Sequence, residues 1–515
     1  MLKLIKKNKY NLISFVCIFI YIFIYSHIGF SVDDGGYMYG AGWRLLNGEV
    51  LYLDYIYARP PLSPLISALL QFLLPDNYEY LYTRIFYYFE IFTYSYLSIV
   101  IIKKIINIKR EHILVLSTIT FMINAHFNNY LWHTVDGIFF AAISLYFLVN
   151  KKYTISVIFL IFSCMTKQSF YPLFFIYPLI VYMNDSKMFF LKYVFKEILF
   201  VFLVVFSWYL LYSNSFTAFI DLKQSKSQIA PFLKSGFIVY IFHFLLFFIL
   251  FMILSILKFE KLKKKSFIRK YLILKSFFLK TNLYILFFTI IGLFFIDIPF
   301  AKIFHMQITF IMLLVFIDEF IVFYLKRNKQ RFSLILGLFF IAWSASLSWG
   351  YQTPIFFIGV FFILYFYKNK HILKRFDLII LRSTIILFFI LVPWIISERG
   401  LFDLKSISFF GEKLNGIYVK NDDKFENMKK INNKIEGCIK SNEKWEVFPD
   451  FTFIKYVKND KSYISLDWIS NVEAMNKTNK IEKQIHNVDC LILNHNYRFK
   501  NKKEEFDWDY KPEGY

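Results

Sequence analysis

The chain has 515 residues, of which 57% are hydrophobic and 22% aromatic, and its formal net charge is +23 at pH 7. This apolar content is too high for a soluble protein of this length, and apolar stretches long enough to cross a bilayer recur from end to end. The composition therefore predicts a polytopic membrane protein. The basic residues lie in short clusters between the apolar stretches, which indicates topology signals and contact with anionic lipids, and not nucleic-acid binding.

The first apolar stretch, at about 11–30, follows four lysines within the first ten residues. It is long and lacks a small-residue cleavage site, so we interpret it as a membrane span and not as a cleavable signal peptide. The next segment, 31–80, holds only two basic residues, Arg44 and Arg59. Because basic residues concentrate on the cytoplasmic side, this contrast predicts a cytoplasmic N-terminus and an outer first loop.

Further spans follow with alternating orientation, since basic clusters return to the cytoplasmic side after every second one. We expect them at about 81–102, 112–130, 135–150, 153–167, 170–184, 196–213 and 236–257, on both sides of "DIPFAK" (297–302), on both sides of "SWGYQT" (348–353), and at 377–396. The fold class expected is a polytopic α-helical membrane protein with about thirteen transmembrane helices. The last helix would deliver the C-terminus to the outside.

After about residue 397 charged and amide residues dominate. The strand-like runs "WEVFPDF", "SYISLDW" and "VDCLILN" and the helix-like segment "KFENMKKINNKIEGCIKS" predict a small extracytoplasmic α/β domain over 397–515. Residues 1–396 would form the transmembrane domain. Cys438 and Cys490 lie in the outer domain, where a disulfide can persist, but the sequence alone leaves their pairing open.

Several polar residues are not explained by the apolar pattern, and the predicted topology places them on the outer side. They are Asp33, Asp34, Asp54, Arg59, Asp136, Lys167, Gln168 and His305. Any one of them is more often a solvated interfacial residue, and His126, His133 and His305 are more often interfacial than metal ligands. Carboxylates that share one face with Arg and Lys, however, are typical of a functional site.

This set of residues favours one kind of chemistry. A carboxylate can accept a proton from an attacking hydroxyl or amine, and Arg or Lys can hold a phosphate. The inventory fits group transfer from a lipid phosphate at the outer leaflet. Three other ionisable residues, Glu90, Asp318 and Glu319, are interpreted as packing or helix-pairing groups.

The first outer loop carries a family likeness. Its residues 32–69, "VDDGGYMYGAGWRLLNGEVLYLDYIYARPPLSPLISAL", resemble the corresponding loop of GT-C class membrane glycosyltransferases. The resemblance is to the bacterial relatives of protein O-mannosyltransferases and to the lipid A aminoarabinose transferase. "TVDGIFFAAISLYF" (134–147) and "MTKQSFYPLFFIYP" (165–178) are similar to two further motifs of these enzymes. The likeness is good over 1–185 and weaker beyond.

The resemblance implies a role for each candidate residue. Asp33, with Asp34 beside it, would be the general base that activates the acceptor, and Asp136 would position the acceptor or a cation. Arg59 and Lys167, with Gln168, would bind the lipid phosphate. Apart from the resemblance, the outer positions of His305 and Asp54 make them candidates for contact with substrate or a cation. Three positions depart from the usual pattern: Asp34 replaces a frequent Glu, Arg59 a Lys, and Ala58 a Glu that some relatives carry.

The function expected is therefore an inverting glycosyltransferase of the bacterial cytoplasmic membrane. It would move a sugar from a polyprenyl-phosphate donor to a lipid-linked glycan, lipid A, surface polymer or protein acceptor on the outer face. Membrane lipids are its other expected partners. The sequence requires no cofactor and leaves open whether the protein uses a divalent cation. The alternatives are a polysaccharide polymerase or ligase, a lipid-linked sugar flippase or transporter, and a scaffold without activity.

Overall fold

The computed structural model describes residues 2–30, 34–125, 130–223, 264–295, 297–326, 328–346, 355–390, 403–448, 453–465 and 478–493. Helices dominate the part before residue 391. They are α1 (Leu2–His27), α2 (Asp34–Leu46), α3 (Leu62–Leu73), α4 (Glu79–Ile102), α5 (His112–Asn124), α6 (His133–Val149), α7 (Tyr153–Thr166), η1 (Gln168–Phe170), α8 (Leu173–Asn184), α9 (Lys187–Leu211), α10 (Ser213–Lys223), α12 (Lys264–Phe295), α13 (Asp297–Lys326), α14 (Lys329–Ser346), α15 (Ile358–Phe362) with its π-helical continuation η2 (Ile363–Tyr367), η3 (Lys370–Ile372) and α16 (Arg375–Ile390).

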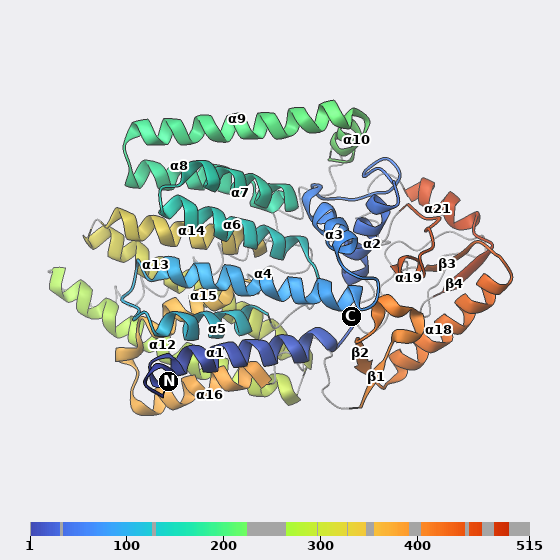
Figure 1. Cartoon of the computed structure of the whole chain (residues 1–515). Coiled ribbons are helices and arrows are strands. Elements are labelled where there is room, and N and C mark those ends of the chain that lie inside the picture. The colour runs from blue at the N-terminus through green and yellow to red at the C-terminus, as the bar shows by residue number, and fades with distance from the viewer. Residues whose placement is uncertain are drawn as a thin grey trace.

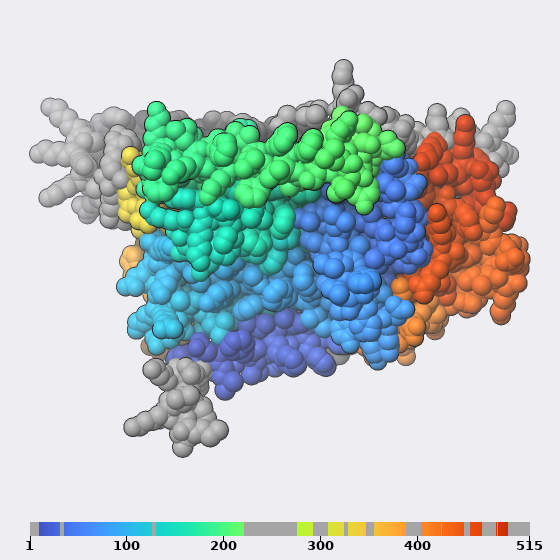
Figure 2. All heavy atoms as spheres, turned by 45° about the horizontal axis from the view of Figure 1, so that its top comes forward, coloured from blue at the N-terminus to red at the C-terminus, as the bar shows by residue number. Residues whose placement is uncertain are grey.

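Among the described residues, three helical segments are long and apolar enough to cross a membrane: Tyr10–His27, Glu79–Ile102 and Lys187–Leu211. Shorter apolar helices pack beside them, and most of the helices run roughly side by side (Figure 1). Helices α9 and α10 form an outer surface of this assembly (Figure 2). The architecture agrees with a helical membrane protein, while the number of about thirteen spans stays a prediction.

The predicted spans and the observed helices coincide in most of the described chain, with three differences. Helix α9 begins at Lys187 and not near 196; its first turns carry the exposed Lys187 and Lys192, which a boundary drawn from apolar residues leaves out. The first part of the expected polar loop 214–235 is helical and belongs to α10. "DIPFAK" lies in the first turns of α13. The expected span 236–257 and the "SWGYQT" turn lie outside the described residues.

Asp318 and Glu319 pair helices, as their position in an apolar segment predicted. Asp318 of α13 accepts from Lys275 of α12 at 2.9 Å, and Glu319 accepts from Nε of Arg331 of α14 at 2.5 Å. Lys368 contacts both carboxylates. Because each charge has a partner of opposite sign, these groups can remain ionised among apolar helices.

The described part of the C-terminal region, within 403–493, forms two small sheets and three α-helices. Strands β1 (Leu404–Ser406) and β2 (Tyr418–Lys420) are antiparallel, and β3 (Trp445–Phe448) and β4 (Cys490–Leu493) are parallel, with Trp445 opposite Cys490. The helices are α18 (Asp423–Lys440), α19 (Phe453–Val457) and α21 (Thr478–His486), and the turns η4 (Ser408–Phe410) and η5 (Glu412–Leu414) follow β1. The predicted helix and two of the three predicted strands are present. In "SYISLDW" the described residues up to 465 form bends, because Glu446 accepts hydrogen bonds from the Tyr463 amide and the Ser462 hydroxyl.

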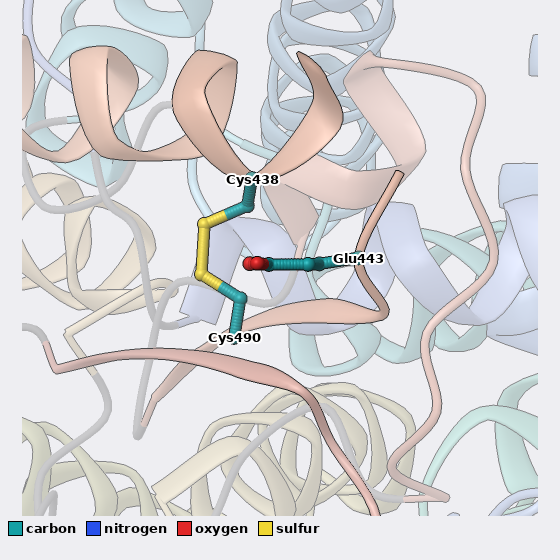
Figure 3. A group of neighbouring side chains, drawn as sticks. All are labelled: Cys438, Glu443 and Cys490. Carbon is teal, nitrogen blue, oxygen red and sulfur yellow. A yellow bond between two sulfur atoms is a disulfide. The ribbon is translucent and has the colours of Figure 1, made fainter. Parts of the chain in front are cut away.

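Cys438 and Cys490 are joined by a disulfide, which settles the pairing that the sequence left open (Figure 3). The bond ties the last turns of α18 to the first residue of β4. It closes a loop with a sequence separation of 52 residues. The disulfide therefore fixes the helix against the parallel strand pair.

The C-terminal elements gather with α2, α3 and α10 at one end of the helix layer, opposite the N-terminus (Figure 1). Arg44 of α2 links these parts: its guanidinium donates to Glu49 at 2.7 Å and to the carbonyl of Ile464 at 2.6 Å. The Ile56 amide donates to the Ser465 carbonyl at 2.7 Å. The first loop is thus held between the helix layer and the C-terminal elements.

Candidate functional site

Arg59 is buried in the first loop and points at the start of α6. Its Nε donates to Nε2 of His133 at 3.1 Å, and its Nη1 donates to the Tyr37 hydroxyl at 3.1 Å. The guanidinium also lies 5.4 Å from the centre of the Tyr37 ring, in cation–π range. Tyr52 donates to the carbonyl of Arg59 at 2.7 Å. Because two prolines follow Arg59, the backbone here is stiff, and the guanidinium is held in one place.

Lys167 approaches the same turn of α6 from the other side. It ends α7 in an extended conformation, with φ −157° and ψ 137°, and its buried Nζ donates to Oγ1 of Thr134 at 3.0 Å. The next residue, Gln168, donates from Nε2 to the carbonyl of Ala58 at 2.9 Å. The turn after α7 is therefore bound directly to the loop that carries Arg59.

These contacts create a positively charged site at the N-terminus of α6. Its two anchors, His133 and Thr134, are adjacent, so Arg59 and Lys167 are held on the same helical turn, close enough to repel each other electrostatically. The partial positive charge of the helix N-terminus adds to them. Within the described part of the chain, Lys167 forms no ion pair and Nδ1 of His133 has no hydrogen-bond partner. Such a site favours binding of an anion, and above all of a phosphate.

Asp136 lies on the first turn of α6, two residues after Thr134, and it is buried. Its carboxyl group interacts with that of Glu90 on α4, and Ser63 of α3 lies beside the pair. Oδ1 of Asp136 and both carboxyl oxygens of Glu90 have no hydrogen-bond partner among the described residues. A buried pair of carboxyl groups next to an anion site can bind a hydroxyl group or take up a proton.

The structure brings together four of the candidate residues that the sequence predicts: Arg59, Lys167, Gln168 and Asp136. Asp54 does not join them, because its exposed carboxylate accepts from the Val50 amide at 2.6 Å and closes a turn.

The other three candidates are not placed. Asp33 lies outside the described residues. Asp34 begins α2 and His305 lies in α13, and their side chains are likewise not described.

Sequence reasoning missed four members of the site: Tyr37, Ser63, His133 and Thr134. Three of them had a usable signal, since Tyr37 lies in the same loop as Arg59, and His133 and Thr134 lie within three residues of Asp136. His133 was interpreted as an interfacial residue, whereas it is buried against Arg59. Glu90, interpreted as a packing group, lies against Asp136.

One group of three residues with metal-ligand atoms occurs in the described part of the chain: Cys438, Glu443 and Cys490. Figure 3 shows the Glu443 carboxylate directed at the disulfide. A metal ion binds the thiolate form of cysteine, and sulfur atoms joined in a disulfide are not thiolates. Two of the three residues in this group therefore cannot act as metal ligands. The structure thus adds no argument for a metal to the open question of a divalent cation.

The chain matches no family model, no curated protein and no solved structure in comparisons with known proteins. The likeness of residues 32–69 to GT-C class glycosyltransferases therefore stays a prediction.

Proposed function

We propose that this protein is an inverting glycosyltransferase of the bacterial cytoplasmic membrane, with about thirteen spans and an outer C-terminal domain. It transfers a sugar from a polyprenyl-phosphate donor to a glycan, lipid or protein acceptor at the outer leaflet. The observation that carries the proposal is the convergence of Arg59 and Lys167 on one turn of α6, beside the buried carboxyl group of Asp136.

Each part of this arrangement has a task in such a transfer. Arg59 and Lys167 bind the donor phosphate and stabilise the charge that grows on it as it leaves. Gln168 and Tyr37 hold the Arg59 loop in position. Asp136 and Glu90 provide a polar contact for the acceptor, next to the phosphate.

In the reaction itself, a carboxylate takes the proton of the acceptor hydroxyl, and we assign this role to Asp33 from the motif alone. The acceptor oxygen attacks the anomeric carbon while the bond from that carbon to the phosphate oxygen breaks. The electron pair leaves with the polyprenyl phosphate. A single displacement inverts the configuration at the anomeric carbon.

The test is a transfer assay with the purified full-length protein in lipid and a panel of labelled polyprenyl-phosphate sugars. We expect one donor to release free polyprenyl phosphate. Lys167→Met and Arg59→Gln should each lower this rate by roughly 10²-fold or more, because a buried electrostatic partner of the phosphate is lost. Asp33→Asn should abolish it.

Matched controls separate the site from general effects. Lys329→Met and Arg382→Gln remove the same charges at exposed positions and should leave the rate unchanged. If no donor is consumed while lipid-linked glycans still bind, the proposal fails, and the polymerase, ligase and flippase alternatives take its place. If Lys167→Met and Arg59→Gln turn over normally, the assigned phosphate site is wrong.

A further inference from the structure

A lateral groove runs between α8 and α9, away from the Arg59–Lys167 site. Its volume is about 980 Å³, and it shares no lining residue with that site. The walls are almost entirely apolar, with Phe174, Phe175 and Leu179 on α8 and Ile198, Val201 and Phe202 on α9. Helix α9 forms an outer surface of the helix layer, so the groove belongs to the face that meets the membrane (Figure 2). Its dimensions and composition suit lipid chains.

One lining residue does not fit an apolar groove. Glu197 of α9 is only 6% exposed and makes no hydrogen bond or ion pair with any part of the chain that the structure describes. A carboxyl group placed among apolar helices without a partner is costly, and such residues mark binding sites.

The position of Glu197 along the membrane normal can be inferred from a contact of the preceding residue, Lys196. Lys196 donates to Oγ1 of Thr154, the second residue of α7, at 2.6 Å. At the same end of the helices, Lys151 and Asp185 form an ion pair of 2.6 Å. Glu197 thus lies at the depth of the first turn of α7, and the lysine-rich turns of α9 lie toward the Phe190 end of the groove, where lipid head groups are expected. The apolar lining continues from there along α9 to Val205.

We propose that this groove binds a phospholipid whose head group carries a primary ammonium, as in phosphatidylethanolamine. The ammonium donates to the Glu197 carboxylate. The phosphate lies toward the exposed lysines on the first turns of α9, Lys187 and Lys192, and the acyl chains follow the apolar wall. A lipid whose head group has no hydrogen-bond donor would cover the apolar wall, but it would leave the Glu197 carboxylate without a partner. Phosphatidylcholine has the same charge but no N–H to donate.

Native mass spectrometry of the full-length protein in detergent tests this inference. Equal amounts of phosphatidylethanolamine, its N-monomethyl form, phosphatidylcholine and phosphatidylglycerol, all with the same acyl chains, are offered to the protein. We expect phosphatidylethanolamine to be retained at least fivefold more than phosphatidylcholine, with the N-monomethyl lipid between them. This series uses the wild-type protein, so it does not depend on the folding of a variant.

Variants assign the preference to the groove. Glu197→Gln should reduce phosphatidylethanolamine retention to the level of phosphatidylcholine, whereas Glu426→Gln, at an exposed carboxylate of α18, should not. Val201→Trp should fill the groove and lower the retention of every lipid. Equal retention of all four lipids by the wild type, or an unchanged preference in Glu197→Gln, would overturn the inference. Neither result depends on the sugar donor, so this proposal and the proposed function can fail separately.

Discussion

Arg59 and Lys167 differ in how firmly they are held. Arg59 is held by hydrogen bonds to His133 and Tyr37, by the Tyr37 ring and by a proline-stiffened backbone, whereas among the described residues the Lys167 ammonium donates to the Thr134 hydroxyl. The planar guanidinium offers a bidentate grip on a phosphate, and the ammonium offers a compact charge that can follow it. In the GT-C motif that residues 32–69 resemble, this position usually carries Lys; here it carries Arg59, the more rigid cation of the two.

Glu446 of β3 makes a pH-dependent contribution to the C-terminal domain. Burial raises the pKa of its carboxyl group from 4.5 to about 7, although Lys455 and the hydrogen bonds from Tyr463 and Ser462 oppose the shift. Because the pKa of Glu446 is higher in the folded than in the unfolded protein, the protonated carboxyl group favours folding. This contribution to the free energy of unfolding is complete below pH 4.5 and is lost as the pH rises to about 7. The difference corresponds to about 3 kcal/mol.

We expect Glu446→Gln to remove this dependence. Proteolysis of residues 445–493 measures the urea midpoint of unfolding for wild type and variant. The difference between the two midpoints should change between pH 5 and pH 7.5. Glu426→Gln, at an exposed carboxylate, should show a constant gap. A constant gap in Glu446→Gln as well would show that the carboxyl group titrates normally.

Among the elements, the close packing of α6 on η1 positions Lys167. A Cβ atom at Gly137 would lie 2.2 Å from Cε2 of Phe170 and 2.7 Å from Oγ1 of Thr166, so only glycine fits there. Phe170 is fully buried and cannot move aside. We expect Gly137→Ala to destabilise the protein by about 1–3 kcal/mol. It should also reduce donor turnover, because the turn that carries Lys167 is displaced.

Gly437→Ala is the matched control for this prediction. It lies inside α18, and a Cβ there would meet nothing within 4 Å. Since Ala is the better helix former, this change should stabilise by about 0.5–1 kcal/mol and leave turnover intact. Thermal unfolding and the transfer assay on both variants give the comparison. Normal turnover and stability in Gly137→Ala would mean that η1 can shift without consequence.

The disulfide acts on elements too, because it joins α18 to β4. For a sequence separation of 52 residues, the chain-entropy relation gives a stabilisation of about 4 kcal/mol. We expect reductant to lower the urea midpoint of the C-terminal domain, and the Cys438→Ser, Cys490→Ser double variant to start at the lower midpoint and ignore reductant. Peptide mapping without reduction checks the bond itself. Recovery of both cysteines as free thiols would contradict the prediction.

For the whole molecule, Arg44 is one of the contacts that attach the C-terminal domain to the helices. It is buried, pairs with Glu49 and reaches the Ile464 carbonyl, while Lys461 lies 3.7 Å from the other oxygen of Glu49. Removing one partner of a buried pair leaves the other charge uncompensated, at a cost of roughly 3–5 kcal/mol. The C-terminal elements would then pack less firmly on the first loop, which carries Arg59 of the candidate site.

We expect Arg44→Gln to raise hydrogen exchange of the amides at 462–465 by tenfold or more, as measured by mass spectrometry. Arg375→Gln removes an exposed arginine and should change nothing. If exchange at 462–465 stays at the wild-type rate, the domain is held mainly by other contacts, such as the hydrogen bond from Ile56 to Ser465.

The sequence by itself determined where most helices lie, which parts of the C-terminal region form α18, β3 and β4, and four of the residues at the site. These features depend on apolar segments, basic clusters and alternating patterns that are local in the chain. Only the tertiary structure decided that His133 and Thr134 anchor the two cations, that Glu90 meets Asp136, that Arg44 holds the C-terminal domain and that Cys438 pairs with Cys490. Each of these contacts joins residues from different elements, and it depends on how helices rotate and pack, which no local pattern records.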